Sequence, residues 1–248
     1  MCCSCCPGGT ASIVTGSCTV FEEAPLFDFE ELVRSRCSIR RFLPTPVPRG
    51  LLTEALSLAQ LAPSNSNIQP WRLFLVEGER IERLREALRE EVRSNPRELA
   101  PLPASFRAHR RELGTLVYGA MGVARDDDAG RARASQRNYE FFGAPTAGIL
   151  CMHRDLGLVD AVGVGMYLQT LVLGLTARGI GTCVQAALTT YPEVIRRELA
   201  LPDELVILCG LSLGYADPDF PANQLKVPKQ PVEGNVSIFD TAVEPVSG

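Results

Sequence analysis

A cluster of uncharged polar side chains lies between two prolines at residues 63–70. Asparagine and glutamine each present hydrogen-bond donors and an acceptor, so this edge suits a planar heterocycle with alternating N–H and C=O groups. The prolines restrict φ and disfavour helix in the residues before them. A plain Ser/Asn/Pro-rich loop is the alternative, and the residue types alone leave both interpretations open. The cluster comprises Ser64, Asn65, Ser66, Asn67 and Gln69.

Polar and apolar residues alternate in a second stretch, at residues 36–42. Arg36, Ser38 and Arg40 are spaced by two, so in an extended segment their side chains project to one side. Two guanidinium groups flanking a hydroxyl form a site for an anion. A solvated basic strand is the alternative.

Lysine is confined to one place in the chain. The 25 basic residues include only two lysines, Lys226 and Lys229, and the other 23 are arginine. Both lie in a proline-rich segment that reads as an extended arm. Two lysines within four positions, in a chain that otherwise avoids lysine, indicate a specific role.

These three stretches together resemble a known family. Residues 63–71 read Pro-Ser-Asn-Ser-Asn-Ile-Gln-Pro-Trp, which is similar to the Pro-Ser-x-x-Asn-x-Gln-Pro-Trp signature of the FMN-dependent, oxygen-insensitive nitroreductases. The Arg-x-Ser-x-Arg-x-Phe pattern at 36–42 and the Lys-Val-Pro-Lys arm at 226–229 occur in the family's order. The resemblance covers about residues 27–240.

The resemblance implies the fold and the assembly. The family fold is α+β, with a mixed, mainly antiparallel central sheet flanked by helices, in an intertwined homodimer with two FMN sites at its interface. One FMN-binding domain is therefore expected at residues 26–240, with a C-terminal arm at 216–240 that crosses onto the partner. NAD(P)H is expected to deliver hydride, leave, and be replaced in the same open pocket by a nitroaromatic or quinone acceptor.

The resemblance also distributes the cofactor-binding roles. Arg36 and the two lysines are expected to hold the FMN phosphate, and Arg40 to stabilise negative charge near flavin N1 and O2. The backbone of Gln185 and Ala186 is expected to meet N5 and O4. The family often has Glu-Gly there, so Gln-Ala is a departure that leaves substrate orientation open. The expected cofactor-binding set is Arg36, Ser38, Arg40, Pro63, Ser64, Asn65, Asn67, Gln69, Gln185, Ala186, Lys226 and Lys229.

Two alternatives to a general nitroreductase stay open. One is a specialised relative, such as a reductive dehalogenase or a flavin-fragmenting enzyme, with a substrate lid at residues 96–136. The other is a non-catalytic flavin-binding protein, which would not oxidise NAD(P)H when an acceptor is added. The substrate pocket is equally open, because Phe141 and Phe142 either form its wall or pack in the core.

Composition narrows the class of protein. The chain has 248 residues, 46% of them hydrophobic, and a net charge of −4, which gives no basic surface for nucleic acid. No unbroken apolar run reaches the roughly 18 residues of a membrane span, so no membrane role is expected. Nine cysteines, an odd number without repeated spacing, argue against a disulfide framework and predict a reducing, cytoplasmic setting. The Cys-rich tail at residues 1–25 is predicted to be disordered, with metal or lipid attachment as alternatives.

Three tempting motifs do not fit their usual context. Residues 210–214 match Gly-x-Ser-x-Gly, but the apolar strand is expected to continue through the serine and no histidine follows it. Asp126, Asp127 and Asp128 lack the alternating ligand spacing of a calcium loop and read as a solvated turn. Two histidines and scattered cysteines predict no metal site.

Hydrophobic periodicity predicts the elements that position these stretches. The helix expected at residues 160–178 carries almost no charge, so it should be buried, and Gly163, Gly165 and Gly174 should permit close packing. The resemblance places this helix in the dimer core, whereas the alternation of helices and strands alone suggests a generic α/β fold. Helices are expected at 27–36, 48–61, 80–93, 106–122, 130–142, 160–178 and 191–200, and strands at 72–76, 147–152, 182–185 and 204–213.

Overall fold

The structure, a computed structural model, describes residues 26–239, so the predicted tail at 1–25 lies outside the described residues. Four strands form one sheet in the order β1-β2-β4-β3, and each neighbouring pair is antiparallel. Within residues 26–239 the only parallel pairing is an isolated bridge between Ser38 and Thr182. The expected α+β fold is confirmed, with a sheet that is antiparallel throughout. The strands are β1 (Arg72–Glu77), β2 (Thr146–His153), β3 (Gly181–Gln185) and β4 (Leu205–Gly214).

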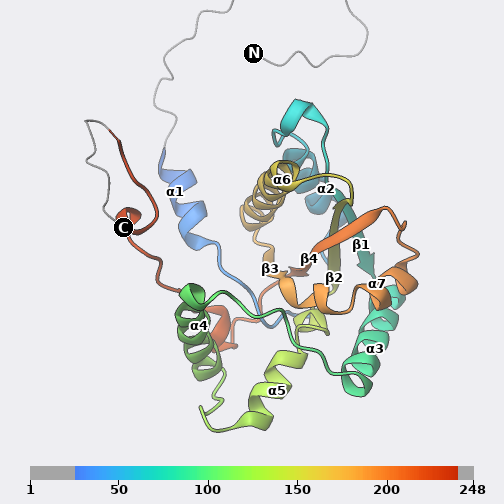
Figure 1. The fold of residues 1–248 in the computed structure, drawn as a ribbon, viewed down its shortest axis with the longest axis vertical. Coiled ribbons are helices and arrows are strands. Elements are labelled where there is room, and N and C mark those ends of the chain that lie inside the picture. Colours follow the sequence, from blue (N-terminus) through green and yellow to red (C-terminus); the bar gives the residue numbers. More distant parts are fainter. Residues whose placement is uncertain (1–25, 240–248) are drawn as a thin grey trace, which may run out of the picture.

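Helices cover both faces of this sheet (Figure 1). Helices α2 (Arg49–Ala59) and α6 (Leu158–Thr176) pack on one face, and α3 (Glu79–Ser94) and α7 (Pro192–Leu199) on the other. Successive residues of β2 alternate between the two hydrophobic cores. Because both of its faces are buried, β2 reads as a continuous apolar run.

Three helices and the C-terminal arm lie outside these layers (Figure 1). They are α1 (Leu26–Ser35), α4 (Arg107–Ala120) and α5 (Asp128–Gln136). The arm after β4 contains two short 3₁₀ turns, η5 (Pro221–Asn223) and η6 (Val232–Gly234). Apolar side chains on α1 and on the arm are left exposed, which is typical of surfaces that meet a partner. They are Phe29, Val33, Val232, Val236, Ile238 and Phe239.

The helix expected at residues 130–142 is shorter than predicted. Helix α5 ends at Gln136, and a 3₁₀ turn (η3, Phe141–Gly143) follows it. Phe141 and Phe142 adopt left-handed backbone angles, with φ of 51° and 53°. This conformation places both rings in the core, so tertiary packing overrides the local helical pattern. At its other end α5 is capped by Asp127, whose carboxylate accepts from Gly130 N at 2.7 Å, as suits a turn.

Helix α6 is only partly buried, contrary to expectation. Tyr167, Leu171 and Leu175 lie in the core, but Leu158 and Val159 at its first turn are 89% and 69% exposed. By length and composition alone α6 is apolar enough to cross a membrane. The packing of one of its faces against α2 explains much of that apolarity. The exposed face has no partner among residues 26–239.

The single cysteines of the core behave as small apolar residues. Cys151, Cys183 and Cys209 are buried and unpaired. Burial raises the pKa of each thiol from 9.0 to about 11. All three therefore remain neutral near pH 7 and are poor nucleophiles.

This burial predicts an alkaline loss of stability. A thiol whose pKa is higher in the folded state stabilises the fold fully below about pH 9 and loses that contribution as the pH rises to about 11. We expect the free energy of unfolding to fall by about 2–3 kcal/mol per thiol over this range. Denaturant titrations at pH 8 and pH 11 measure the fall, and it should be smaller in Cys209→Ala. Equal falls in both proteins would contradict the assignment.

Candidate functional site

A cavity of about 200 Å³ opens beside the predicted anion-binding stretch. Arg36 and Ser38 line it, together with Thr182 of β3. The polar lining residues are therefore one arginine, two residues with hydroxyl groups and the amide residue Gln169, and the others are apolar. The sequence analysis did not place Gln169 and Thr182 in a binding site. An amide side chain such as Gln169 in an otherwise apolar helix could have indicated such a site. The other lining residues are Gly165, Leu168, Gln169, Val172 and Val184.

The first stretch is extended, as predicted, because it is tied to the edge of β3. Ser38 bridges Thr182, and Ile39 N donates to Thr182 O at 2.9 Å. Arg40 donates to the carbonyl of Ser38 at 3.2 Å and does not line the cavity. Among residues 26–239, neither Arg36 nor Arg40 has a carboxylate within 4.0 Å. Their uncompensated charges make this edge attractive to an anion.

Asn223 of η5 holds this stretch in place. Its Oδ1 accepts from the backbone N–H of Arg40 at 2.7 Å and of Arg41 at 3.2 Å. Its Nδ2 donates to the carbonyls of Arg41 and Asp217, at 2.8 and 2.9 Å. The side chain is buried and every polar contact is made within the protein. Sequence reasoning missed Asn223 because Arg40 and Arg41, which it holds in place, lie more than 180 positions away.

The end of β3 lies next to the cavity, where Gln185 and Ala186 were predicted to meet a cofactor. The side chain of Gln185 is buried: Oε1 accepts from Ser212 at 2.6 Å and Nε2 donates to Asn138 O at 2.7 Å. Any ligand contact here is therefore left to the backbone, and Ala186 is exposed at the start of η4 (Ala186–Thr190). Ser212 lies inside β4, which confirms that the Gly-x-Ser-x-Gly match is strand interior.

The polar loop between the prolines has a strained backbone. Ser66, Asn67 and Gln69 have φ of 48°, 56° and 48°, a region that costs non-glycine residues about 1–3 kcal/mol each. Ser64 Oγ fixes the loop by accepting from Gln69 N at 3.0 Å. The side chains of Asn65, Asn67 and Gln69 are exposed. Strain of this kind gathers at functional sites, which favours a binding loop over a plain connection.

One chain does not bring this loop to the Arg36 cavity. The loop packs on Gly163, where an added Cβ would lie 3.2 Å from the Cβ of Ser64. Gly165, by contrast, lines the Arg36 cavity. Successive helical residues are about 100° apart, so the two glycines face nearly opposite sides of α6. The predicted cofactor-binding residues are thus divided between two faces of one helix.

The two glycines provide a matched pair of substitutions. We expect Gly163→Leu to destabilise the chain by about 1–3 kcal/mol, because the side chain must displace the Ser64 loop. Gly165→Leu should cost less in the FMN-free chain, since an added Cβ there meets nothing within 4 Å in a single chain and helix propensity improves. Thermal unfolding of both variants tests this. Similar melting temperatures would contradict the packing described.

The remaining predicted residues lie elsewhere. Phe141 and Phe142 are 0% and 5% exposed, so the core-packing alternative describes them and neither forms an open substrate wall in this chain. Lys226 and Lys229 are exposed on the arm and do not line the Arg36 cavity. Pro63 is exposed next to the strained loop.

Known proteins are similar to this chain in sequence and in fold. A 4-nitrobenzoate reductase from Pseudomonas putida is 39% identical over 214 residues, which is 84% of this chain and 93% of that protein. A nitrobenzene nitroreductase from Ectopseudomonas oleovorans is 35% identical and covers 82% of this chain and 93% of its own length.

Solved structures give the same result. The FMN and NADPH-dependent nitroreductase NfnB from sphigopyxis sp. strain HMH superposes with a TM-score of 0.82, at 32% identity, over 86% of this chain and 99% of that one. NfnB from Mycobacterium smegmatis, in complex with NADPH, gives 0.80 at 31% identity, over 86% and 98%. The family model described as Nitroreductase family matches residues 33–215. The chain therefore belongs to the nitroreductase family.

Proposed function

We propose that this chain is an FMN-dependent oxidoreductase that uses NAD(P)H to reduce nitroaromatic or quinone-type acceptors. The observation that carries the proposal is the cavity lined by Arg36, Ser38 and Thr182, next to the end of β3. Relatives named as reductases of 4-nitrobenzoate and nitrobenzene support the acceptor class. FMN and NADPH dependence in the NfnB structures supports the cofactor and the donor.

The residues of the cavity fit FMN. Arg36 supplies a free cation for the phosphate, and Ser38, Thr182 and Gln169 supply neutral donors and acceptors for ribityl oxygens. The apolar side chains of α6 suit the flavin ring. Bound FMN supplies the two-electron chemistry, while the chain supplies binding and electrostatics. Arg40 lies close to the cavity as a positive charge without a carboxylate partner among residues 26–239.

We further propose ping-pong kinetics. Val184 and Ala186 are exposed at the end of β3, where the donor and the acceptor would bind in turn. Parallel lines in double-reciprocal plots at several NADPH concentrations would support this order, and intersecting lines would contradict it.

The functional unit is proposed to be a homodimer. The Ser64 loop and the Arg36 cavity lie on different faces of α6, so a second copy must supply one half if both contact the same flavin. The exposed apolar surfaces of α1, α6 and the arm would be covered in such a dimer. Light scattering of the purified protein measures the mass directly.

Lys226 and Lys229 are proposed to hold the FMN phosphate. Asn223 fixes the arm at the Arg40 segment, and an extended chain spans at most about 3.5 Å per residue. Lys226 is therefore within about 10 Å of that anchor and Lys229 within about 20 Å. If FMN binds Lys226→Ala/Lys229→Ala as tightly as it binds the unchanged protein, these roles are wrong.

One spectroscopic experiment tests the central proposal. Purified protein should show flavin absorbance that bleaches when NADPH is added without oxygen and returns when a nitroarene is added. A protein that binds FMN but does not oxidise NADPH would be the non-catalytic alternative. A colourless protein that takes up no added FMN would end the oxidoreductase interpretation.

A further inference from the structure

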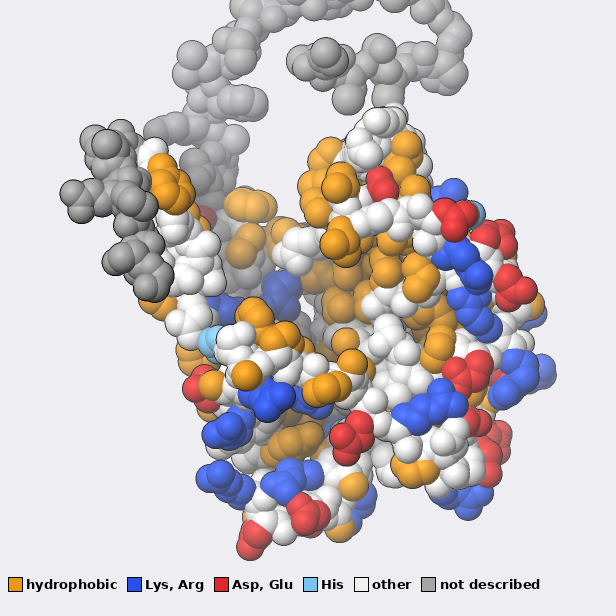
Figure 2. Space-filling model, viewed as in Figure 1, with side chains coloured by type: hydrophobic (Ala, Val, Ile, Leu, Met, Phe, Trp, Pro, Cys, Tyr) orange, Lys and Arg blue, Asp and Glu red, His pale blue; other side chains and the backbone are white. Residues whose placement is uncertain are grey.

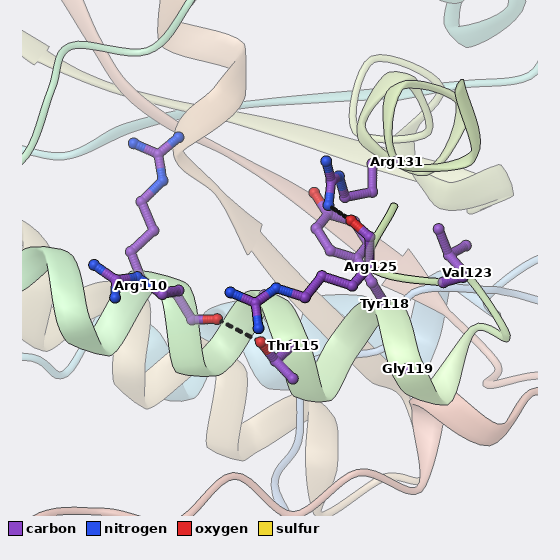
Figure 3. Close-up of a pocket in the computed structure, with 10 residues that line it drawn as sticks. Arg110, Thr115, Tyr118, Gly119, Val123, Arg125 and Arg131 are labelled. Carbon is purple, nitrogen blue, oxygen red and sulfur yellow. Dashed lines mark hydrogen bonds between the residues drawn. The ribbon is translucent and has the colours of Figure 1, made fainter. Parts of the chain in front are cut away.

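A second pocket lies between α4 and α5, with a volume of about 360 Å³ (Figure 3). It shares no lining residue with the Arg36 cavity. Four arginines surround it, and Figure 2 shows basic side chains gathered over these helices. Nothing in the proposed function uses this pocket. The four arginines are Arg110, Arg111, Arg125 and Arg131.

Most of this positive charge is uncompensated. Arg131 pairs with Asp128 and donates to the carbonyl of Arg125. Among residues 26–239, Arg110, Arg111 and Arg125 have no carboxylate within 4.0 Å. Their guanidinium groups lie around one pocket, with Arg125 reaching back along α4 above Thr115 (Figure 3). Clustered guanidiniums without acidic partners favour phosphate or carboxylate.

The inner surface of the pocket offers an aromatic ring and little side-chain bulk. It includes the ring of Tyr118, Val123 and two glycines of α4. A glycine inside a helix costs about 1 kcal/mol relative to alanine, and an added Cβ at Gly119 would meet nothing within 4 Å. Packing therefore does not require Gly119, whereas a larger side chain there would fill the pocket. Tyrosine and arginine both stack on planar rings.

We propose that this pocket binds a small anion carried on a planar ring. Its volume suits a compact organic ligand. Two sources share this chemistry: the 2′-phosphoadenosine end of NADPH and a nitroarene that bears a carboxylate. The choice of sources rests on the proposed function, whereas the binding chemistry rests on the arginines, Tyr118 and the open floor.

Calorimetry on the FMN-loaded protein separates the two sources. The probes are 2′,5′-ADP and 4-nitrobenzoate, with adenosine and nitrobenzene as their uncharged controls. Two pocket variants are used, Arg110→Gln/Arg111→Gln and Gly119→Leu. Arg80→Gln is the matched control, because Arg80 is an exposed arginine on α3 outside the pocket. Gly119→Leu guards against loss of folding, since leucine is a better helix former than glycine.

We expect at least one charged probe to bind, and both pocket variants to weaken it by about tenfold or more, while Arg80→Gln leaves it unchanged. Weakening of 2′,5′-ADP alone, with a higher KM for NADPH but not for NADH, identifies the dinucleotide. Weakening of 4-nitrobenzoate alone identifies the carboxylate. Absence of binding by both probes, or binding that neither variant alters, overturns the proposal. Nitroarene reduction is assayed separately. Its absence would contradict the proposed function and leave the binding result valid.

Discussion

Arg36→Gln is expected to weaken FMN binding by about tenfold to a hundredfold. Arg36 lines the cavity and has no carboxylate partner among residues 26–239, so its charge is free for the phosphate. A hydrogen bond to a charged group contributes about 1.5–3 kcal/mol, and each 1.4 kcal/mol is tenfold in Kd. Fluorescence titration of the apoprotein with FMN measures the change.

Arg34→Gln is the matched control for that experiment. Arg34 is two residues away, highly exposed, and faces Glu30 at 3.6 Å. Its loss should leave FMN affinity nearly unchanged, since Arg34 does not line the cavity and its charge is paired with Glu30. Equal losses in both variants would mean that general positive charge, rather than the cavity, attracts the phosphate.

Asn223→Ala is expected to produce the largest loss of stability, about 3–4 kcal/mol. The change removes four hydrogen bonds and leaves the backbone N–H groups of Arg40 and Arg41 without their acceptor. Net contributions of about 1 kcal/mol per bond add up to this value. Urea unfolding measures it.

A second readout separates positioning from stability. Once the Arg36–Arg41 segment is released, FMN should bind more weakly even at temperatures where Asn223→Ala is fully folded. Asn235→Ala, on the same arm but exposed, should alter neither quantity. Normal FMN affinity in folded Asn223→Ala would leave Asn223 with a purely structural role.

The strained backbone of the Ser64 loop is independent support for a ligand-binding site. Three non-glycine residues with positive φ lie within residues 66–69, and glycine would relieve that strain at each of them. The exposed side chains of Ser66, Asn67 and Gln69 make few contacts inside the chain. Polar side chains held at strained positions favour a ligand that uses them.

Much of the fold was predictable from hydrophobic periodicity. The apolar runs of β1, β2 and β4 and the amphipathic pattern of α3 set element type and approximate bounds. The antiparallel order β1-β2-β4-β3 could not be predicted from periodicity, because alternation of helices and strands equally suits a parallel α/β sheet. The resemblance, rather than the pattern, supplied the correct fold.

The sequence by itself determined the chemistry that this protein offers: an Arg-x-Ser-x-Arg stretch, a neutral polar loop and two isolated lysines. Residue type and short spacing suffice for such statements because they concern groups only a few positions apart. Tertiary structure alone decided that Asn223 holds Arg40, that Phe141 enters the core and that Gln185 faces inward. Each depends on a partner far along the chain, and buried polar groups must find such partners, so only the folded packing fixes which side chains remain free for a ligand.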